Sequence, residues 1–204
     1  MPFVSLASFQ LAGRGRGRNQ WLSPAGCLQF SILLKLPRGF PANKVVFAQY
    51  IAGLAICQGL DEDGKLGVRI KWPNDIYAEA EGLSQSGSAV KTSGGSNDDQ
   101  APPLTKGRAK LGGILVNSSF VKGEWHLVVG CGVNILNDLP TTSLAQLNEL
   151  AHARKGHAGP APVPSMESSL AKILVAFEEI WQRFVQERSF EGFLDEYTGR
   201  WLHT

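Results

Sequence analysis

The chain has 204 residues, a length typical of one large domain or of one domain with insertions. Its formal net charge of +2 gives no reason to expect a polyanionic partner, so nucleic acid is not an expected ligand. No apolar run approaches the length that crosses a membrane, and the N-terminal residues do not follow a signal-peptide pattern.

The first predicted elements are two strands, at residues 3–9 and 27–34, joined by a loop rich in arginine and glycine. In this loop, residues 10–21, three arginines alternate with glycines before Trp21. Glycine lets the backbone approach a ligand, arginine presents a planar fork of donors to phosphate or carboxylate, and tryptophan offers a flat face. The loop therefore predicts a clamp for an anionic, nucleotide-like ligand. Arg-Gly repeats are also common in disordered nucleic-acid-binding tails, but the flanking strands favour a folded loop.

The middle of the chain predicts a helix, a strand and an inserted loop. Residues 41–60 carry apolar side chains at helical spacing, with Gly59 as a C-terminal stop. Residues 67–78 contain a strand that ends at the motif Lys-Trp-Pro-Asn-Asp of residues 71–75. Residues 79–108 are rich in Gly, Ser, Asp and Pro, which indicates a flexible insertion within the domain.

The second half of the chain predicts a β-hairpin followed by helices. Residues 110–118 and 125–135 form its two strands, and residues 152–165 predict a second flexible loop. Apolar residues between positions 170 and 185 recur at helical spacing, and residues 190–201 predict a shorter helix. The residue before the longer helix, Ser165, is expected to cap it.

The motif at residues 71–75 carries the first polar cluster. Pro73 cannot donate to a strand ladder, so the chain must turn there and present Asn74 and Asp75 at the sheet edge. Asp75 can hold Mg²⁺ through oxygen, and Lys71 can neutralise a phosphate. An ordinary Asn-Asp turn after a strand is the alternative on these residues alone.

Lys110 and Gly113 lie at the start of the next predicted strand. Glycine within a strand costs stability unless something must approach the backbone, so Gly113 indicates a ligand close to the sheet. A β-bulge is the alternative explanation of the glycines.

Small residues recur on the neighbouring strand at residues 130–132, where Gly132 helps to hollow a slot. Val116 and Val133 are expected to line this slot. Asn134 can fix a polar end of a ligand, although it can equally pair with local backbone.

Taken together, four segments resemble the catalytic domain of biotin protein ligases, also called holocarboxylase synthetases. They are residues 10–28, 71–75, 110–115 and 130–134. Each motif is modest alone, but their joint order and spacing are highly specific. Residues 140–144 and the insertion resemble eukaryotic, particularly fungal, members.

The resemblance implies an α+β fold in which helices pack on a mixed, largely antiparallel central sheet, as in class II synthetase-like biotin/lipoate ligases. It implies that biotin and ATP, with Mg²⁺, form biotinyl-5′-AMP and pyrophosphate. The biotinyl group then passes to a lysine on the biotin-carrier domain of a carboxylase. A lipoate-attaching ligase of the same fold is the sibling alternative.

The resemblance also assigns roles to residues. Biotin and adenylate contacts fall on Gln10, Gly13, Arg14, Gly15, Arg16, Trp21, Lys71, Asn74, Asp75, Lys110, Gly113, Val116, Gly132 and Asn134. Lys110, Arg14 and Arg16 are the expected catalytic cations, and Trp21 is expected to stack on adenine. Asp75 is the expected Mg²⁺ ligand.

The family pattern also sets expectations for the ends of the chain. Residues 1–204 are expected to be the catalytic domain, without the Ser/Thr-rich segment that precedes it and the small β-barrel that follows it in the family. An inactive truncated remnant is therefore a further alternative. The sequence does not indicate an oligomeric state.

The cysteine content sets an expectation for the compartment. The chain has three cysteines and no CxxC pair, which favours a reducing compartment. A cytoplasmic location is therefore expected, and a mitochondrial form is left open.

Overall fold

Six antiparallel strands form one sheet in the order β1-β4-β8-β7-β6-β5 in the computed structural model, which describes residues 3–80, 107–138 and 141–202. The strands are β1 (Phe3–Ala7), β4 (Cys27–Lys35), β5 (Val68–Lys71), β6 (Asp75–Glu79), β7 (Arg108–Val121) and β8 (Glu124–Asn134). A separate hairpin of β2 (Gly13–Arg14) and β3 (Gln20–Trp21) lies between β1 and β4 in the chain.

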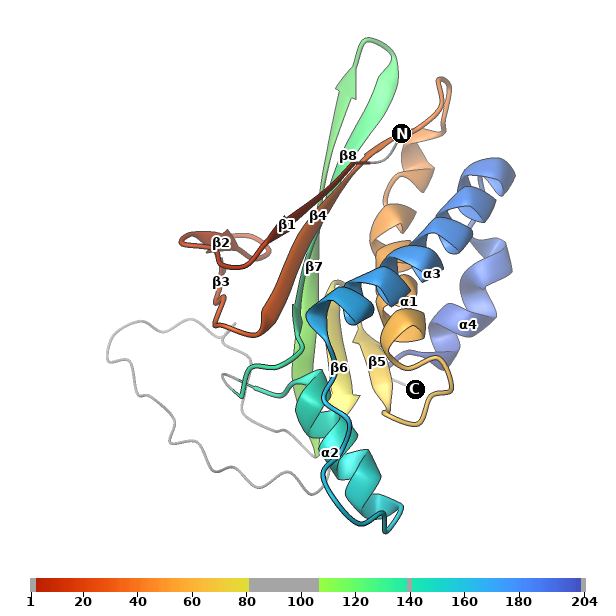
Figure 1. Ribbon diagram of the computed structural model, residues 1–204. Helices are drawn as coiled ribbons and strands as arrows, with labels where there is room; N and C mark the ends of the chain where they lie inside the picture. The colour runs from red at the N-terminus through yellow and green to blue at the C-terminus, as the bar shows by residue number, and fades with distance from the viewer. Residues whose placement is uncertain (1–2, 81–106, 139–140, 203–204) are drawn as a thin grey trace.

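The helices gather on one side of this sheet. They are α1 (Phe47–Leu60), α2 (Leu144–Arg154), α3 (Met166–Glu187) and α4 (Leu194–Gly199), with short 3-10 turns at Ala42–Lys44 and Glu191–Phe193. Figure 1 shows α1, α3 and α4 beside one face of the sheet, whereas the β2–β3 hairpin projects from the other side. Among the described residues, none of the helices is long and apolar enough to cross a membrane.

The core lies between the sheet and the two long helices. In α1, Ile51, Leu54 and Ile56 are fully buried, and α3 adds Ile173 and Phe184. Burial of such side chains stabilises a fold by about 1.5–3 kcal/mol each. Helix α1 is therefore a central helix, which explains why nearly all of its positions are apolar.

Gly59 permits the close contact of α1 with α3. A Cβ atom at Gly59 would stand 2.7 Å from both Cα and N of Ile173, a distance that real Cβ atoms do not tolerate. The helix continues to Leu60, so Gly59 belongs to its last turn and serves packing.

Strand alternation divides the sheet into two chemically different faces. Leu28, Phe30 and Ile32 of β4 belong to the core, so Cys27 and Gln29 belong to the opposite face. Directly opposed residues in antiparallel strands point to the same face of the sheet. The residues paired with Cys27 and Gln29 on the neighbouring strands therefore lie on this opposite face too. We call this the open face; it carries Cys27, Gln29, Asp75, Gly113, Gly132 and Asn134.

Most predicted elements are confirmed, and the predicted cap is among them. The backbone N–H of Ser168 donates to Ser165 Oγ over 3.0 Å at the start of α3. The β7–β8 hairpin turns at Lys122 and Gly123, both of which have positive φ. The helix predicted from residue 41 instead begins at Phe47, after a 3-10 turn.

The predicted loop at residues 10–21 contains the short strands β2 and β3, and two larger elements, β6 and α2, were also not predicted. The strand predicted to end at the motif of residues 71–75 is β5; after the turn at residues 72–74 the chain returns as β6, which pairs with both β5 and β7. Helix α2 occupies residues 144–154, so the second loop begins after residue 154. The first insertion is also shorter than expected at both ends, because Glu79 and Arg108 pair within strands; its residues 81–106 lie outside the described part.

Candidate functional site

A β-bulge on β7 brings Lys110 and Gly113 to the same face. Tyr77 of β6 lies opposite Lys110, and Ile76 lies opposite Gly112, so Leu111 is the extra residue. In a regular strand, residues three apart point to opposite faces; the bulge cancels this difference. The β-bulge that was the alternative explanation of the glycines is therefore present in β7. This bulge directs the Lys110 side chain to the open face.

Lys110 forms an ion pair on the open face. Its Nζ lies 2.7 Å from Oδ1 of Asp75, and the two side chains are 23% and 24% exposed. Asp75 is the first residue of β6 and lies opposite Gly113, which has no side chain to separate the pair from the sheet. The arrangement holds a partly buried cation at a fixed position, where solvent screens its charge less than at the surface.

The indole ring of Trp21 lies on the glycines of the open face. A Cβ atom at Gly132 would stand 2.5–2.7 Å from three atoms of this ring, and one at Gly113 would stand 3.6 Å from it. Lys110 Nζ lies 5.9 Å from the ring centroid, within the range of a cation–π contact. The slot predicted from the small residues thus exists at Gly132, and the Trp21 ring fills it.

The Arg-Gly loop is a folded hairpin. Gly13 pairs with Trp21 and Arg14 with Gln20, and the backbone N–H of Gly15 donates to Asn19 O over 2.8 Å. Gly17 adopts a φ of +69° at the tip, where glycine meets no steric cost. Arg14, Arg16 and Arg18 are all exposed on this hairpin.

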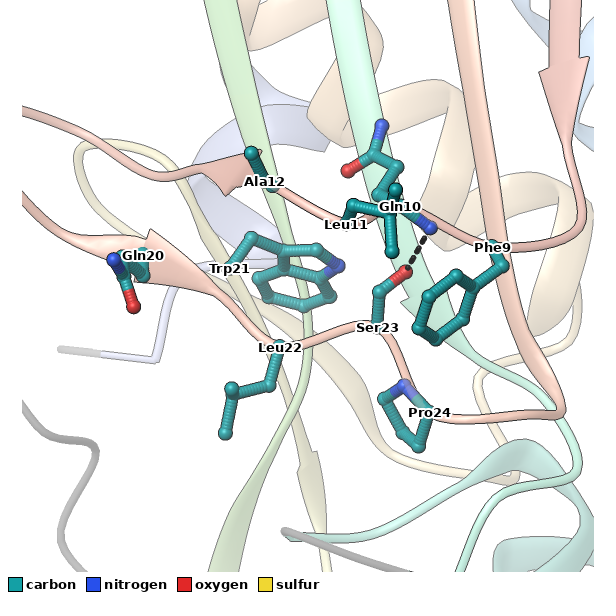
Figure 2. A pocket seen from close by; sticks show the side chains of 10 residues that line it. Phe9, Gln10, Leu11, Ala12, Gln20, Trp21, Leu22, Ser23 and Pro24 are labelled. Carbon is teal, nitrogen blue, oxygen red and sulfur yellow. Dashed lines mark hydrogen bonds between the residues drawn. The ribbon is translucent and has the colours of Figure 1, made fainter.

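A pocket of about 530 Å³ lies between the hairpin and the preceding segment. Figure 2 shows Phe9, Gln10 and Ser23 grouped beside the Trp21 ring. The backbone N–H of Gln10 donates to Ser23 Oγ over 3.2 Å, which ties the two ends of the loop together. Gln10, Gly13 and Trp21 all line this pocket.

The turn at residues 72–74 fixes the position of Asp75. Asn74 bonds to the backbone of Ile114 twice: its carbonyl accepts from the Ile114 N–H over 2.8 Å, and its Nδ2 donates to Ile114 O over 3.2 Å. Asn74 therefore anchors the turn to β7 through its backbone and its side-chain amide. An ordinary Asn-Asp turn was the alternative explanation of this motif. The turn is present, but it is also bonded to β7 next to Asp75.

Lys71 lies directly opposite Asp75 on β5. Its Nζ donates to the hydroxyl of Tyr77 over 3.3 Å and lies 4.8 Å from the centroid of that ring. Lys71 and Lys110 are thus two cations on one face, on either side of β6. The contact with Tyr77 directs Lys71 to its present position.

Asn134 is connected to Lys110 through Thr141. Asn134 is 3% exposed, and its Nδ2 donates to Thr141 Oγ1 over 3.2 Å. Thr141 Oγ1 in turn donates to the backbone carbonyl of Lys110. These bonds hold the backbone of Lys110 against the segment that follows β8.

The structure corrects the expected placement of two valines. Val116 lies opposite Val129, and Val133 lies opposite Gly112 and Leu28. Val129, Val133 and Leu28 belong to the core between sheet and helices. Val116 and Val133 therefore face the helices rather than the slot, because the strand period places them on the opposite side from Gly113 and Gly132.

Three residues near the site were not identified from the sequence. Tyr77 contacts Lys71 across the β5–β6 hairpin, and Thr141 contacts Lys110 across 31 positions of the chain. No local sequence pattern reveals either contact. Gln29 lies opposite Gly132 on the open face and is 1% exposed. A lone glutamine in an apolar strand was the available signal, but alternation alone predicts an exposed side chain there.

Cys27, opposite Asn134, completes this part of the open face. Burial raises the pKa of its thiol to about 11, while contacts with the Trp21 side chain and the Val133 backbone lower it in part. The thiol is therefore protonated at neutral pH. Cys27 contributes a small neutral surface beside Trp21 and no nucleophile.

Comparisons with known proteins identify the family of the chain. The sequence profile described as "Biotin/lipoate A/B protein ligase family" matches residues 1–134. A protein named biotin–protein ligase from Schizosaccharomyces pombe is 35% identical over 208 residues, which cover 99% of this chain and 30% of that protein. The chain spans between 24% and 51% of the length of four such relatives from fission yeast, human and Arabidopsis thaliana.

Solved structures share the fold. The Leishmania major biotin protein ligase in complex with biotinyl-5-AMP has a TM-score of 0.63 at 20% identity, over 98% of this chain and 71% of that one. The Aquifex aeolicus biotin protein ligase in complex with biotin and ATP has a TM-score of 0.63 at 23% identity, over 98% of this chain and 68% of that one. The expected sheet covered by helices is thereby confirmed. Because the profile match extends over residues 1–134, more than half of its length, the chain belongs to the biotin/lipoate A/B protein ligase family.

Proposed function

We propose that residues 1–204 form the catalytic domain of an ATP-dependent biotin–protein ligase. The observation that carries the proposal is the open-face group of Lys110, Asp75 and Trp21, in which a partly buried cation meets a carboxylate and an aromatic ring. The relatives named biotin–protein ligases support the same reaction.

In the first step, a carboxylate oxygen of biotin attacks the α-phosphorus of ATP. A new P–O bond forms, the bond to the β-phosphate oxygen breaks, and pyrophosphate leaves with the electron pair. Negative charge accumulates around the α-phosphate, and a fixed cation aimed at that charge is a large source of catalysis. Lys110 supplies this cation, because its ammonium group is already held by Asp75 and the bulge fixes its backbone.

The arginines of the hairpin add a second positive surface. Arg14 and Arg16 are exposed, so their guanidinium groups are accessible to a phosphate or a carboxylate. Trp21, at the base of the same hairpin, offers one face of its ring to adenine. Because Gln10 and Gly13 line the same pocket as Trp21, a nucleotide that binds Trp21 also affects where these two residues lie.

Asp75 suits the expected Mg²⁺ only in a particular mode. Within the described ranges, no group of three or more His, Cys, Asp or Glu residues could hold a metal. Mg²⁺ is commonly bound by one or two carboxylates together with substrate phosphates and water, and Asp75 has a second carboxylate oxygen beyond the one near Lys110. Mg²⁺ bound in this way would neutralise phosphate charge, while Asp75 and Asn74 shape its surroundings.

In the second step, the ε-amine of an acceptor lysine attacks the acyl carbon of biotinyl-5′-AMP. An amide bond forms, the bond from the acyl carbon to the phosphate oxygen breaks, AMP leaves and the amine loses a proton. We assign the acceptor lysine to the biotin-carrier domain of a carboxylase, as the motif resemblance implies; the name of the relatives supports only that the acceptor is a protein. The three free, buried cysteines agree with a reducing compartment such as the cytoplasm.

The experiment that tests this function is pyrophosphate release from ATP with either biotin or lipoate as the acid. Release with biotin and none above background with lipoate supports the proposal. Release with lipoate alone assigns the chain to the lipoate branch of the same family. Release with neither acid, from protein with an intact cooperative unfolding transition, contradicts activity of this chain and favours the inactive remnant.

A further inference from the structure

Gln29 places a carboxamide beneath the surface of the open face. It lies directly opposite Gly132 on one side and Ala7 on the other, so neither neighbour covers it with a large side chain. Trp21 lies on Gly132, and Trp21 belongs to a hairpin that forms its own two-stranded sheet. Gln29 therefore lies next to the region of the open face that the Trp21 ring covers, and this ring belongs to the β2–β3 hairpin rather than to the six-stranded sheet.

The side chain of Gln29 is almost completely buried. Its side chain is 1% exposed, and among the described residues neither Oε1 nor Nε2 has a hydrogen-bond partner. A buried polar group without a partner is costly, and leucine of similar size would avoid that cost.

We infer that Gln29 is a recognition residue whose carboxamide pairs with a planar ligand edge carrying one donor beside one acceptor. This inference rests on the proposed function, because it needs the ligand to occupy the open face. A carboxamide offers one N–H and one C=O side by side, so such an edge satisfies both groups at once. The pairing converts an unfavourable feature of the ligand-free protein into specificity for the ligand.

Two parts of the proposed substrates carry this chemistry. The ureido ring of biotin presents N–H beside C=O, and adenine presents its exocyclic N–H beside a ring nitrogen, an edge that glutamine pairs with in nucleic-acid recognition. Lipoate carries neither edge on its ring. The experiment below distinguishes the two sources.

The test compares Gln29→Leu with the unchanged chain by calorimetry, with biotin and AMP as separate probes. Loss of at least about tenfold in affinity for biotin, with AMP changed less than about twofold, identifies the ureido ring. The converse result identifies adenine. Retention of both affinities within about twofold overturns the inference and leaves the proposed function intact, whereas absence of binding of either probe to the unchanged chain counts against the proposed function itself.

A matched control and a stability measurement make the result specific. Gln182→Leu makes the same chemical change on the exposed side of α3, where Gln182 bonds to Glu178, and both affinities are expected to stay within about twofold. Gln29→Leu is expected to raise the Tm of the ligand-free protein by about 2–4 °C, because the unpartnered atoms are removed. A lowered Tm would mean that the carboxamide is already satisfied, and it would overturn the inference without any ligand.

A spectroscopic readout reports on the carboxamide directly. In ¹⁵N-labelled protein, the side-chain NH₂ resonance of Gln29 is identified by its loss in Gln29→Leu. It should shift on saturation with the probe whose affinity depends on Gln29. An unchanged resonance at saturation with both probes contradicts the pairing.

Discussion

Lys110 Nζ lies 2.7 Å from Asp75 Oδ1. The two residues belong to different strands, β7 and β6, and 34 residues lie between them in the chain. The bulge at Leu111 and the turn before Asp75 both contribute to this contact. Because Asp75 holds the ammonium group in place before any ligand binds, Lys110 is pre-organised for negative charge that develops beside it.

Replacing Lys110 by alanine should slow adenylate formation at least about tenfold, which corresponds to about 1.4 kcal/mol of barrier. Pyrophosphate release with biotin and ATP measures the effect. Lys122→Ala at the β7–β8 turn is the control, because Lys122 is exposed and far along the strand from the site. Near-normal release by Lys110→Ala would remove this residue from the mechanism.

Gly132 is predicted to tolerate no side chain without loss of the Trp21 contact. In Gly132→Ala the new Cβ would stand 2.5–2.7 Å from the ring, so Trp21 must move away. We expect Trp21 to become more accessible to acrylamide quenching, and this increase should vanish when Trp21 is also changed to phenylalanine. Binding of biotinyl-5′-AMP should weaken at least about tenfold.

Gly130→Ala is the matched control for that change. Gly130 lies two residues earlier on the same face of β8, and a Cβ there meets nothing closer than Leu115 O at 3.5 Å, an ordinary contact. Quenching and binding should therefore resemble those of the unchanged chain. Equal effects of the two substitutions would show that Trp21 does not depend on the slot.

Much of this architecture was predictable from local patterns. Alternation predicted β4, β7 and β8, helical spacing predicted α1 and α3, and Ser165 identified the start of α3. Strand β6 was not predicted because its pairing with β7 spans an insertion. Helix α2 was not predicted because Leu144 and Leu147 are its only buried residues, so its apolar pattern is weak.

The exposed arginines of the hairpin should contribute mainly through charge. Replacing Arg16 with alanine removes an exposed donor fork. ATP affinity should therefore fall about fivefold to tenfold at low salt, with a smaller effect at high salt. Calorimetry at two salt concentrations measures this. Arg188→Ala, an exposed arginine after α3, should leave affinity unchanged; a salt-independent loss for Arg16→Ala would contradict a charge-based role.

Buried thiols should make the protein sensitive to alkaline pH. Burial raises the pKa of Cys57 and of Cys131 from 9.0 to about 12. Since the folded state holds these protons more tightly than the unfolded state, their contribution to stability is complete below pH 9 and is lost as pH rises towards 12. The free energy of unfolding should therefore fall between about pH 8 and about pH 10, by about 1.4 kcal/mol for each such thiol.

Urea unfolding at these two pH values tests the effect, and Cys57→Ala isolates one thiol. The fall in unfolding free energy should be smaller in Cys57→Ala than in the unchanged chain. An equal fall in both proteins would assign the pH dependence to other groups.

The candidate site was predictable as a set of residue types but not as a geometry. The sequence indicated Lys110, Asp75 and the small residues near Gly132, since each belongs to a short motif. The ion pair of Lys110 with Asp75 depends on the β-bulge. The face of the sheet to which Val116 and Val133 point depends on the strand register, so neither feature follows from composition. Gln29 could be recognised only when its burial was known, together with its lack of a hydrogen-bond partner in the part of the chain that the structure describes.

The most direct test of the central claim is calorimetric titration of biotinyl-5′-AMP into the unchanged chain and into Lys110→Ala. We expect saturable binding to the unchanged chain and an affinity at least about tenfold lower in the variant. Equal affinities for the two proteins, or absence of binding to a folded unchanged chain, would contradict the assignment of this open face as the adenylate site.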